Sequence, residues 1–139
     1  MYILDTNVVS ELRKARSGKA NPLVVDWSEN VSASSLFLSA ISVLEIEIGI
    51  LSVQRRDSIQ GSVLRSWMDN QVLPAFHERI LPIDTVVSQR CAKLHVPDPR
   101  SDRDALIGAT ALVHGMTVVT RNVSDFEPLG VDIFNPWKR

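Results

Sequence analysis

The sequence predicts an α/β fold in which a mostly parallel central sheet is flanked by helices in three layers. Short apolar runs alternate with stretches of helical periodicity along all 139 residues, and this alternation is typical of βα units. The first apolar run ends abruptly at Asp5, after which Val8, Val9 and Leu12 follow a helical period. No repeat, low-complexity tract or linker interrupts the pattern, so we expect a single domain over residues 1–139.

The composition is that of an ordinary globular protein, with 45% apolar and 22% charged residues. Fifteen basic and sixteen acidic residues give a formal net charge of −1. A protein of this charge cannot hold nucleic acid by bulk electrostatics, and would need local basic patches or metal ions. The single cysteine, Cys91, excludes an intramolecular disulfide. Its position four residues after Val87 on an amphipathic segment predicts a buried, structural thiol.

We expect a cytoplasmic protein with no membrane segment. The N-terminus enters a strand at once, without the basic region and cleavage site of a signal peptide. The most apolar stretch, residues 36–51, contains Glu45 and Glu47 and is too short to span a bilayer.

The next elements are predicted from caps and breakers. Asn21 and Pro22 predict a helix start, because Asn caps well and Pro suits the first helical position. Residues 36–39 form the expected second strand. Ser42 and Glu45 match a capping box, so we expect the following helix to begin at Ser42.

Glycine and proline mark the middle of the chain. Gly49 lies inside the helix just described, where it costs about 1 kcal/mol relative to Ala, so it predicts close packing or a bend. A long helix is expected over residues 59–73 and should stop at Pro74. Residues 80–83 form a short strand at the edge of the sheet, because Pro82 cannot donate to a ladder.

The last third of the chain follows the same alternation. The expected elements are a helix capped by Asp84 or Thr85, a loop over 96–100, a helix opened by Ser101 and closed by His114-Gly115, a strand over 116–120, a polar loop over 121–125 and a last strand over 131–134.

Polar side chains occupy comparable places along this alternation. Asp5 ends the first strand, Glu45 and Asp104 lie in first helical turns, and Asn122 and Asp125 follow a later strand. In a parallel sheet the strand ends and the following helix starts share one edge, where ligands bind, so these groups should converge. Each has an alternative explanation as a helix or turn cap. The inference therefore depends on the set.

Several carboxylates close together repel one another unless a cation neutralises them. Oxygen ligands without nearby His or Cys select Mg²⁺ or Mn²⁺, and His77, His95 and His114 are too scattered for a zinc site. The sequence contains neither a phosphate-binding GxxxxGK[ST] loop nor a serine nucleophile elbow. A carboxylate-held Mg²⁺ serves phosphate chemistry, because it neutralises the phosphate and lowers the pKa of a bound water.

At these residues the chain resembles the PIN-domain ribonucleases, and among them the VapC-like and especially the FitB-like toxins of bacterial type II toxin–antitoxin pairs. The resemblance covers nearly the whole chain and consists of an ordered series of motifs: residues 3–11, Ser42 to Glu45 with Gly49, residues 104–111 with Gly108 where alanine is commoner, residues 117–126, and the tail 134–137.

The resemblance implies that Asp5, Glu45 and Asp104 hold the metal, and it selects Asp104 over its neighbour Asp102. Asn122 stands where many relatives have aspartate. An amide oxygen can ligate a metal but brings no charge, which leaves Asp125 as a substitute for the fourth acid. The alternative is that Asn122 caps a turn and never faces the metal.

The function that the resemblance implies is a Mg²⁺-dependent endoribonuclease, with Mn²⁺ able to substitute, acting as a toxin. Thr6 and Thr120 would hydrogen-bond the acids or the phosphate, and Asn7 would orient Asp5. The expected partners are an RNA substrate, a cognate antitoxin bound along a groove near the site, and a second copy of the chain. DNA would be reached only through the antitoxin.

Two other functions fit the residues less well. A PIN-like binding module with a decayed acid site is one, with Asn122 as its first sign. A phosphatase with an aspartate nucleophile is the other, although its usual second acid is replaced by Asn7. Trp27, Trp67 and Trp137 leave either aromatic surface for a partner or, as we expect for Trp67, further core.

Overall fold

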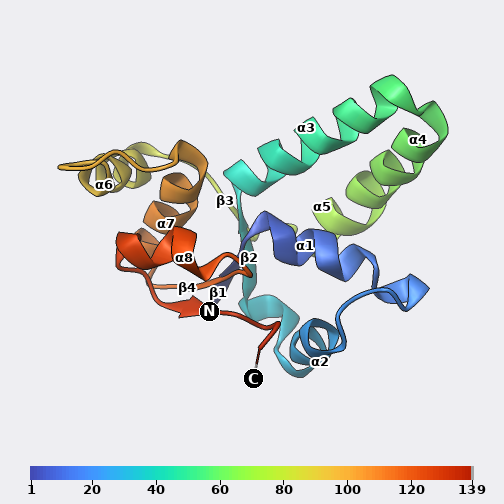
Figure 1. Cartoon of the computed structure of the whole chain (residues 1–139), viewed down its shortest axis with the longest axis horizontal. Helices are drawn as coiled ribbons and strands as arrows, with labels where there is room; N and C mark the ends of the chain where they lie inside the picture. Colours follow the sequence, from blue (N-terminus) through green and yellow to red (C-terminus); the bar gives the residue numbers. More distant parts are fainter. Residues whose placement is uncertain (139) are drawn as a thin grey trace.

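The computed structural model describes residues 1–138, and its centre is a five-stranded sheet of order β3-β2-β1-β4-β5 with every pairing parallel (Figure 1). Arg139, the last residue of the predicted domain, lies outside the described residues. The strands are β1 (Tyr2–Leu4), β2 (Leu36–Ser39), β3 (Ile80–Leu81), β4 (Thr117–Val119) and β5 (Ile133–Phe134). The predicted α/β fold with a parallel sheet is confirmed, and the run at residues 80–83 is an edge strand as expected.

Helices connect the strands and cover the sheet. The α-helices are α1 (Thr6–Arg13), α2 (Pro22–Asn30), α3 (Ala40–Arg56), α4 (Ser58–Trp67), α5 (Leu73–Ala75), α6 (Thr85–Leu94), α7 (Asp102–His114) and α8 (Val123–Phe126). Shorter helical turns are η1 (Ala15–Ser17), η2 (Ala33–Ser35), η3 (Met68–Val72) and η4 (Glu127–Leu129). Within the described residues, no helix combines the length and the apolar character needed to cross a membrane.

The two faces of the sheet bury separate apolar clusters, because successive strand residues point to opposite sides. Leu4 packs with Val8 of α1 and Ile46 of α3 on one face. Ile3 packs with Ile107 of α7 and Phe126 of α8 on the other. These side chains are almost fully buried. Figure 1 shows α3 and α4 as a hairpin projecting from the sheet, with α6 and α7 on the opposite side.

The register of β1 and β4 sets the position of the first acid. Leu4 pairs with Val119, and the Asp5 N–H donates to the Val119 carbonyl at 2.9 Å. The next residue on each strand, Asp5 and Thr120, therefore lies at the same carboxyl edge.

The predicted capping box is wrong. Helix α3 begins at Ala40, because the Ser39 hydroxyl accepts the Ile41 N–H at 3.0 Å and caps the helix one turn earlier than expected. Ser42 therefore lies inside the helix, and Glu45 has no capping role. This removes the structural explanation for Glu45.

Pro74 does not end its helix, contrary to the prediction. The chain widens into the π-turn η3 and then continues through α5 to Ala75. A wider turn accommodates a proline, which lacks an N–H and would collide with the preceding turn of an α-helix. The polar loop predicted over 121–125 is also wrong, since α8 begins at Val123.

Two predictions about individual side chains have different outcomes. Cys91 is buried as predicted, and burial raises the pKa of its thiol. Gly49 does not mark close packing, because a Cβ at that position would meet nothing within 4 Å. The glycine at a close approach is Gly61 of α4, where a Cβ would lie 2.5 Å from the Cα of Gln54. All three tryptophans are half-buried.

Candidate active site

Asp5 lies at the carboxyl end of β1 and is held there by three donors. Its Oδ1 accepts the Thr6 N–H at 2.8 Å, so the residue does cap α1 as its position suggested. Its Oδ2 accepts the Thr120 hydroxyl at 2.8 Å and the Asn7 amide at 3.2 Å. Burial nevertheless raises the pKa of Asp5, and the hydrogen bonds from Thr120 and Thr6 only partly offset that effect. Asp5 is thus both the N-cap of α1 and a residue of the site.

Glu45 reaches the same edge from α3. Its Oε1 accepts the Thr6 hydroxyl at 2.8 Å, and the Thr6 oxygen also lies 3.1 Å from the Ser42 oxygen. Its Oε2 lies 3.8 Å from an Arg103 guanidinium nitrogen of α7. Because the Arg103 side chain is half exposed, this ion pair is worth about 0–1 kcal/mol and is easily exchanged.

Asp104, in the first turn of α7, has the most perturbed carboxyl group of the site. Burial, followed by the negative charges of Asp5, Asp125 and Glu45, raises its pKa to about 6. Only a weak hydrogen bond with Ser101 acts in the opposite direction. Such a carboxyl group keeps its proton to a higher pH than an ordinary aspartate, and a cation in the site would favour its charged form.

Asn122 and Asp125 occupy the fourth side of the site. Asn122 stands at the start of α8, but its side chain makes no capping hydrogen bond, and its backbone N–H donates to the Thr120 hydroxyl at 3.0 Å instead. Asp125 is exposed, yet it is close enough to raise the pKa values of Asp5 and Asp104. Asn122 therefore faces the cleft, whereas Asp125 acts on it through charge.

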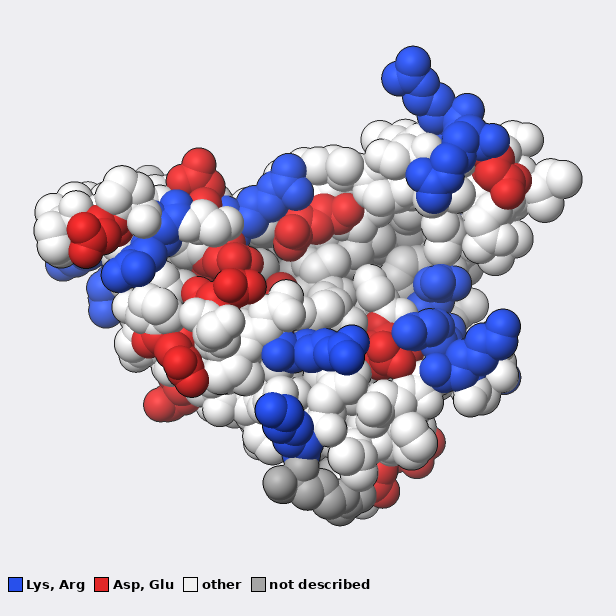
Figure 2. Space-filling model, viewed as in Figure 1, with Lys and Arg blue, Asp and Glu red and all other residues white. Residues whose placement is uncertain are grey.

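These side chains line one cleft of about 540 Å³, a size typical of ligand sites. Its lining comprises Asp5, Thr6, Asn7, Ser10, Glu11, Arg13, Lys14, Glu45, Asp104, Arg121, Asn122 and Trp137. Figure 2 shows acidic side chains to the left of a central hollow and basic side chains to its right and below it. The predicted acidic residues thus share one cleft with basic side chains.

The fit of a divalent metal depends on the donors and their separation. The donor set of Asp5, Glu45 and Asp104 is all oxygen, which suits Mg²⁺. Among residues 1–138, however, no cluster of three or more His, Cys, Asp or Glu side chains is arranged to hold an ion. Glu45 is turned toward Thr6 and Arg103. A cation therefore needs Glu45 to exchange these partners.

Sequence reasoning missed three residues of this cleft or its margin as parts of a site. Arg103 pairs with Glu45 and Arg121 lines the cleft, as does Trp137, which was considered only as part of the tail and as aromatic surface for a partner. The position of Arg103 next to Asp104 was the available signal for the first. Nothing local in the sequence marks Trp137, which reaches the cleft only because β5 lies beside β4.

The chain matches a known protein family and several of its members. The family model described as PIN domain matches residues 2–127. The chain is similar to VapC ribonuclease Y4jK of Sinorhizobium fredii, at 38% identity over 143 residues, and to Toxin FitB of Neisseria gonorrhoeae, at 34% over 143 residues. Each of these matches covers 99% of both chains.

Solved structures agree with these sequence relatives. The crystal structure of FitAcB from Neisseria gonorrhoeae matches with a TM-score of 0.89 and 33% identity, over 99% of each chain. A structure of FitAB bound to a DNA fragment matches equally well, at a TM-score of 0.89 and 34% identity, over 100% of this chain and 97% of that one.

Proposed function

We propose that this chain, which belongs to the PIN-domain family, is a toxin ribonuclease. It would be a hydrolase that cleaves RNA phosphodiester bonds in the acidic cleft. The observation that carries the proposal is the convergence of Asp5, Glu45 and Asp104, from three distant segments, on one cleft. Burial and, after it, the negative charges of the neighbouring acids raise the pKa of Asp104 to about 6. We infer that residues 1–139 form one domain, because the strands share one sheet.

The proposed cofactor is Mg²⁺, with Mn²⁺ able to substitute. Asp5 and Asp104 would hold it directly, and Glu45 would ligate it or orient a water after leaving Thr6 and Arg103. The bound cation would neutralise the scissile phosphate and make a water more acidic. Asn122 would add a neutral oxygen ligand, and Asp125 a nearby negative charge.

The remaining polar residues of the cleft position these acids. Thr120 and Asn7 both donate to Oδ2 of Asp5, and the Thr6 N–H donates to Oδ1, so both carboxylate oxygens are held in place. The Thr6 hydroxyl donates to Glu45 and would hold that side chain beside the site until a cation binds. We assign all three supporting roles, because pre-positioned ligands lower the cost of assembling the reactive geometry.

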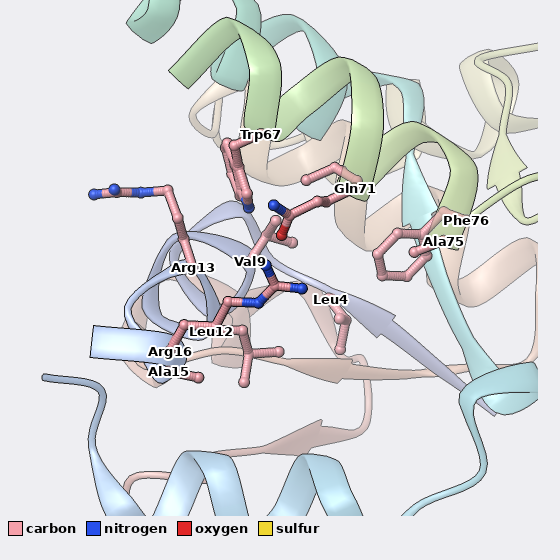
Figure 3. A pocket seen from close by; sticks show the side chains of 11 residues that line it. Leu4, Val9, Leu12, Arg13, Ala15, Arg16, Trp67, Gln71, Ala75 and Phe76 are labelled. Carbon is pink, nitrogen blue, oxygen red and sulfur yellow. The ribbon is translucent and has the colours of Figure 1, made fainter. Parts of the chain in front are cut away.

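The proposed protein partner is a cognate antitoxin, bound in the groove shown in Figure 3. This groove has a volume of about 260 Å³ and a mostly apolar lining, with Leu4, Leu12, Trp67 and Phe76 among its residues. Arg13 and Arg16 also line it. Such a groove suits an amphipathic helix with acidic residues beside its apolar face. Arg13 also lines the acidic cleft, so a bound antitoxin would lie near the site.

We also propose a homodimer, which is supported by the exposed apolar residues of α3. DNA would be contacted only through the antitoxin; the similar FitAB has been solved bound to a DNA fragment. The protein would act in the cytoplasm, where its RNA substrate is found.

The test is cleavage of total cellular RNA by purified protein in Mg²⁺, in EDTA, and with the variant Asp5→Asn. We expect cleavage by the wild type in Mg²⁺ only, and none by Asp5→Asn. RNA binding without cleavage in either Mg²⁺ or Mn²⁺ would instead indicate a decayed binding module. Release of phosphate from a monoester without RNA cleavage would indicate a phosphatase.

A further inference from the structure

We propose that Arg121, held against the indole ring of Trp137, binds an RNA phosphate next to the scissile one and so positions the strand over the acids. Arg121 would be the substrate-binding residue and Trp137 the residue that positions it. The inference rests on the proposed ribonuclease function and adds to it a contact for the neighbouring phosphate.

Arg121 is tied to the acid site through its backbone. It follows Thr120, whose hydroxyl donates to Asp5, and its own N–H donates to the Asn7 Oδ1 at 3.4 Å. Asn7 in turn donates to Asp5 at 3.2 Å. Both Arg121 and Trp137 line the cleft that contains Asp5 and Asp104. An RNA phosphate bound at the acids would therefore lie in the same cleft as this side chain.

Among the described residues, Arg121 forms no ion pair with a carboxylate. The pKa of Glu11 is lowered chiefly by the Asn21 N–H, and the charge of Arg121 is the last of the contributions. Glu11 is already engaged by Lys14 at 3.1 Å and by the Asn21 N–H at 2.9 Å. The guanidinium thus remains available to an anion in the cleft.

Trp137 supplies a fixed surface for that guanidinium. The guanidinium carbon lies 5.6 Å from the centre of the indole ring, within the range of a cation–π interaction. The ring is half-buried against the apolar cluster around Leu4, and its backbone N–H donates to the Asn135 side chain at 3.0 Å. An arginine held over such a ring loses less conformational entropy when it binds.

The chemistry of the guanidinium favours a phosphate as its ligand. Its planar donors match two phosphate oxygens, and it is more weakly hydrated than an ammonium group. A cation held by the acids would act on the scissile phosphate, so the neighbouring phosphate needs a positive partner of its own. Arg121, which follows β4 and lines the same cleft, would supply that charge.

The experiment measures cleavage and binding of a short single-stranded RNA by Arg121→Gln, Arg121→Lys, Trp137→Leu and Trp137→Phe. We expect Arg121→Gln to raise KM about tenfold, the effect of one charge-assisted hydrogen bond, while kcat changes less than twofold. Trp137→Leu should raise KM in the same direction, and Trp137→Phe, which keeps an aromatic face, should restore most of the affinity. Arg121→Lys should fall between the wild type and Arg121→Gln.

Salt dependence separates a phosphate contact from a packing effect. In the cleavage-deficient Asp5→Asn background, Arg121→Gln should lower the slope of log K against log salt by about 0.7, the value for one phosphate of a single strand. The charge-matched control is Lys93→Gln on α6, which lies outside the cleft and should change neither KM nor the slope. Circular dichroism melting checks that each variant is folded.

The outcomes are distinct from those of the proposed function. A wild type that cleaves RNA while Arg121→Gln keeps its KM and its salt slope would overturn this inference and leave the ribonuclease intact. A loss confined to kcat would also overturn it, since the residue would then act on the chemical step. A wild type that neither binds nor cleaves RNA would overturn both.

Discussion

At the scale of single residues, the two aspartates of the cleft differ in how their charge is stabilised. Asp5 accepts three hydrogen bonds, from Thr6, Asn7 and Thr120. Burial and then the charges of the other acids raise the pKa of Asp104 to about 6, and only a hydrogen bond with Ser101 acts in the opposite direction. Asp104 is therefore the group that responds first to protons or to a cation.

We predict that the metal-free protein is more stable at about pH 5 than at about pH 7.5. The pKa of Asp104 is above its usual value of 3.8, so the native state binds the proton more tightly than the unfolded chain. This contribution is complete at low pH and is lost as pH rises through the window from 3.8 to about 6. Thermal melting in EDTA should show it, and Asp104→Asn should reduce the pH dependence.

The same titration governs metal binding, because carboxylate ligands must be deprotonated. Millimolar Mg²⁺ should therefore raise the melting temperature more at about pH 7.5 than at about pH 5.5. Asp5→Asn should lose this shift but keep its fold. The absence of any thermal shift in the wild type at either pH would contradict the metal site.

We predict that Asn122→Asp tightens Mn²⁺ binding, because ligand charge helps to set the affinity for hard ions. Asn122 lines the cleft and its side chain makes no cap, so a carboxylate there would face the other acids. Asp125→Asn, in contrast, should weaken binding only through the loss of a nearby charge. Calorimetric titration measures both, and unchanged affinity in Asn122→Asp would show that this position does not face the metal.

At the scale of elements, the hairpin of α3 and α4 depends on one glycine. We predict that Gly61→Ala destabilises the fold by about 1–2 kcal/mol net, because overpacking against backbone costs about 2–3 kcal/mol. The added Cβ would lie 2.5 Å from the Gln54 Cα, which belongs to backbone and cannot rotate away. This cost exceeds the gain of about 1 kcal/mol in helix propensity. Urea denaturation measures the difference.

The matched control is Gly49→Ala, on the other helix of the hairpin. A Cβ there meets nothing within 4 Å, so only the propensity gain remains and stability should rise by about 1 kcal/mol. Stabilisation by both substitutions would mean that the two helices are not packed as closely at Gly61 as the structure has them.

Element types could be predicted from the sequence because strands and caps have local causes. The Asn21-Pro22 start and the Gly115 end of a helix follow from the residues themselves. The start of α3 could not be predicted in this way. Ser39 and Ser42 both make good caps, and the choice between them depends on the pairing of β2 up to Ser39 with Leu81 of β3. The π-turn before Pro74 likewise depends on packing.

The convergence of the acids could be predicted because parallel strands share a carboxyl edge. The partner of each acid could not. The Thr120–Asp5 hydrogen bond joins residues 115 positions apart and requires the register of Leu4 with Val119. Charge patterns in a single sequence do not show that Arg103 rather than another arginine would pair with Glu45.

At the scale of the whole molecule, the distribution of charged residues explains how a protein with a net charge of −1 would bind a polyanion such as RNA. Asp5, Glu45 and Asp104 lie in the cleft, where a cation would neutralise them, and Arg13, Lys14 and Arg121 line the same cleft. Binding of RNA should accordingly require the metal and weaken with salt.

The hairpin also exposes the surface on which we expect a second copy to bind. Leu44, Ile48 and Leu51 of α3 are 46%, 40% and 57% exposed, and their spacing of four and three residues places them on one helical face. Monomeric proteins rarely expose such a contiguous apolar patch. Burying one such side chain fully contributes about 1.5–3 kcal/mol, so three on each copy can support a dimer.

We predict that the wild type is a dimer by light scattering and that Ile48→Asp is a folded monomer. A carboxylate at the centre of the patch would lose its hydration on association, and its apolar neighbours Leu44 and Leu51 cannot compensate for that cost. The control is Val86→Asp, which changes an equally apolar residue, 57% exposed, on α6 and should leave the dimer intact. A monomeric wild type, or a dimeric Ile48→Asp, would show that α3 is not the interface. Because Glu45 lies on the same helix beside Leu44, loss of the dimer should also lower cleavage if association fixes the position of α3.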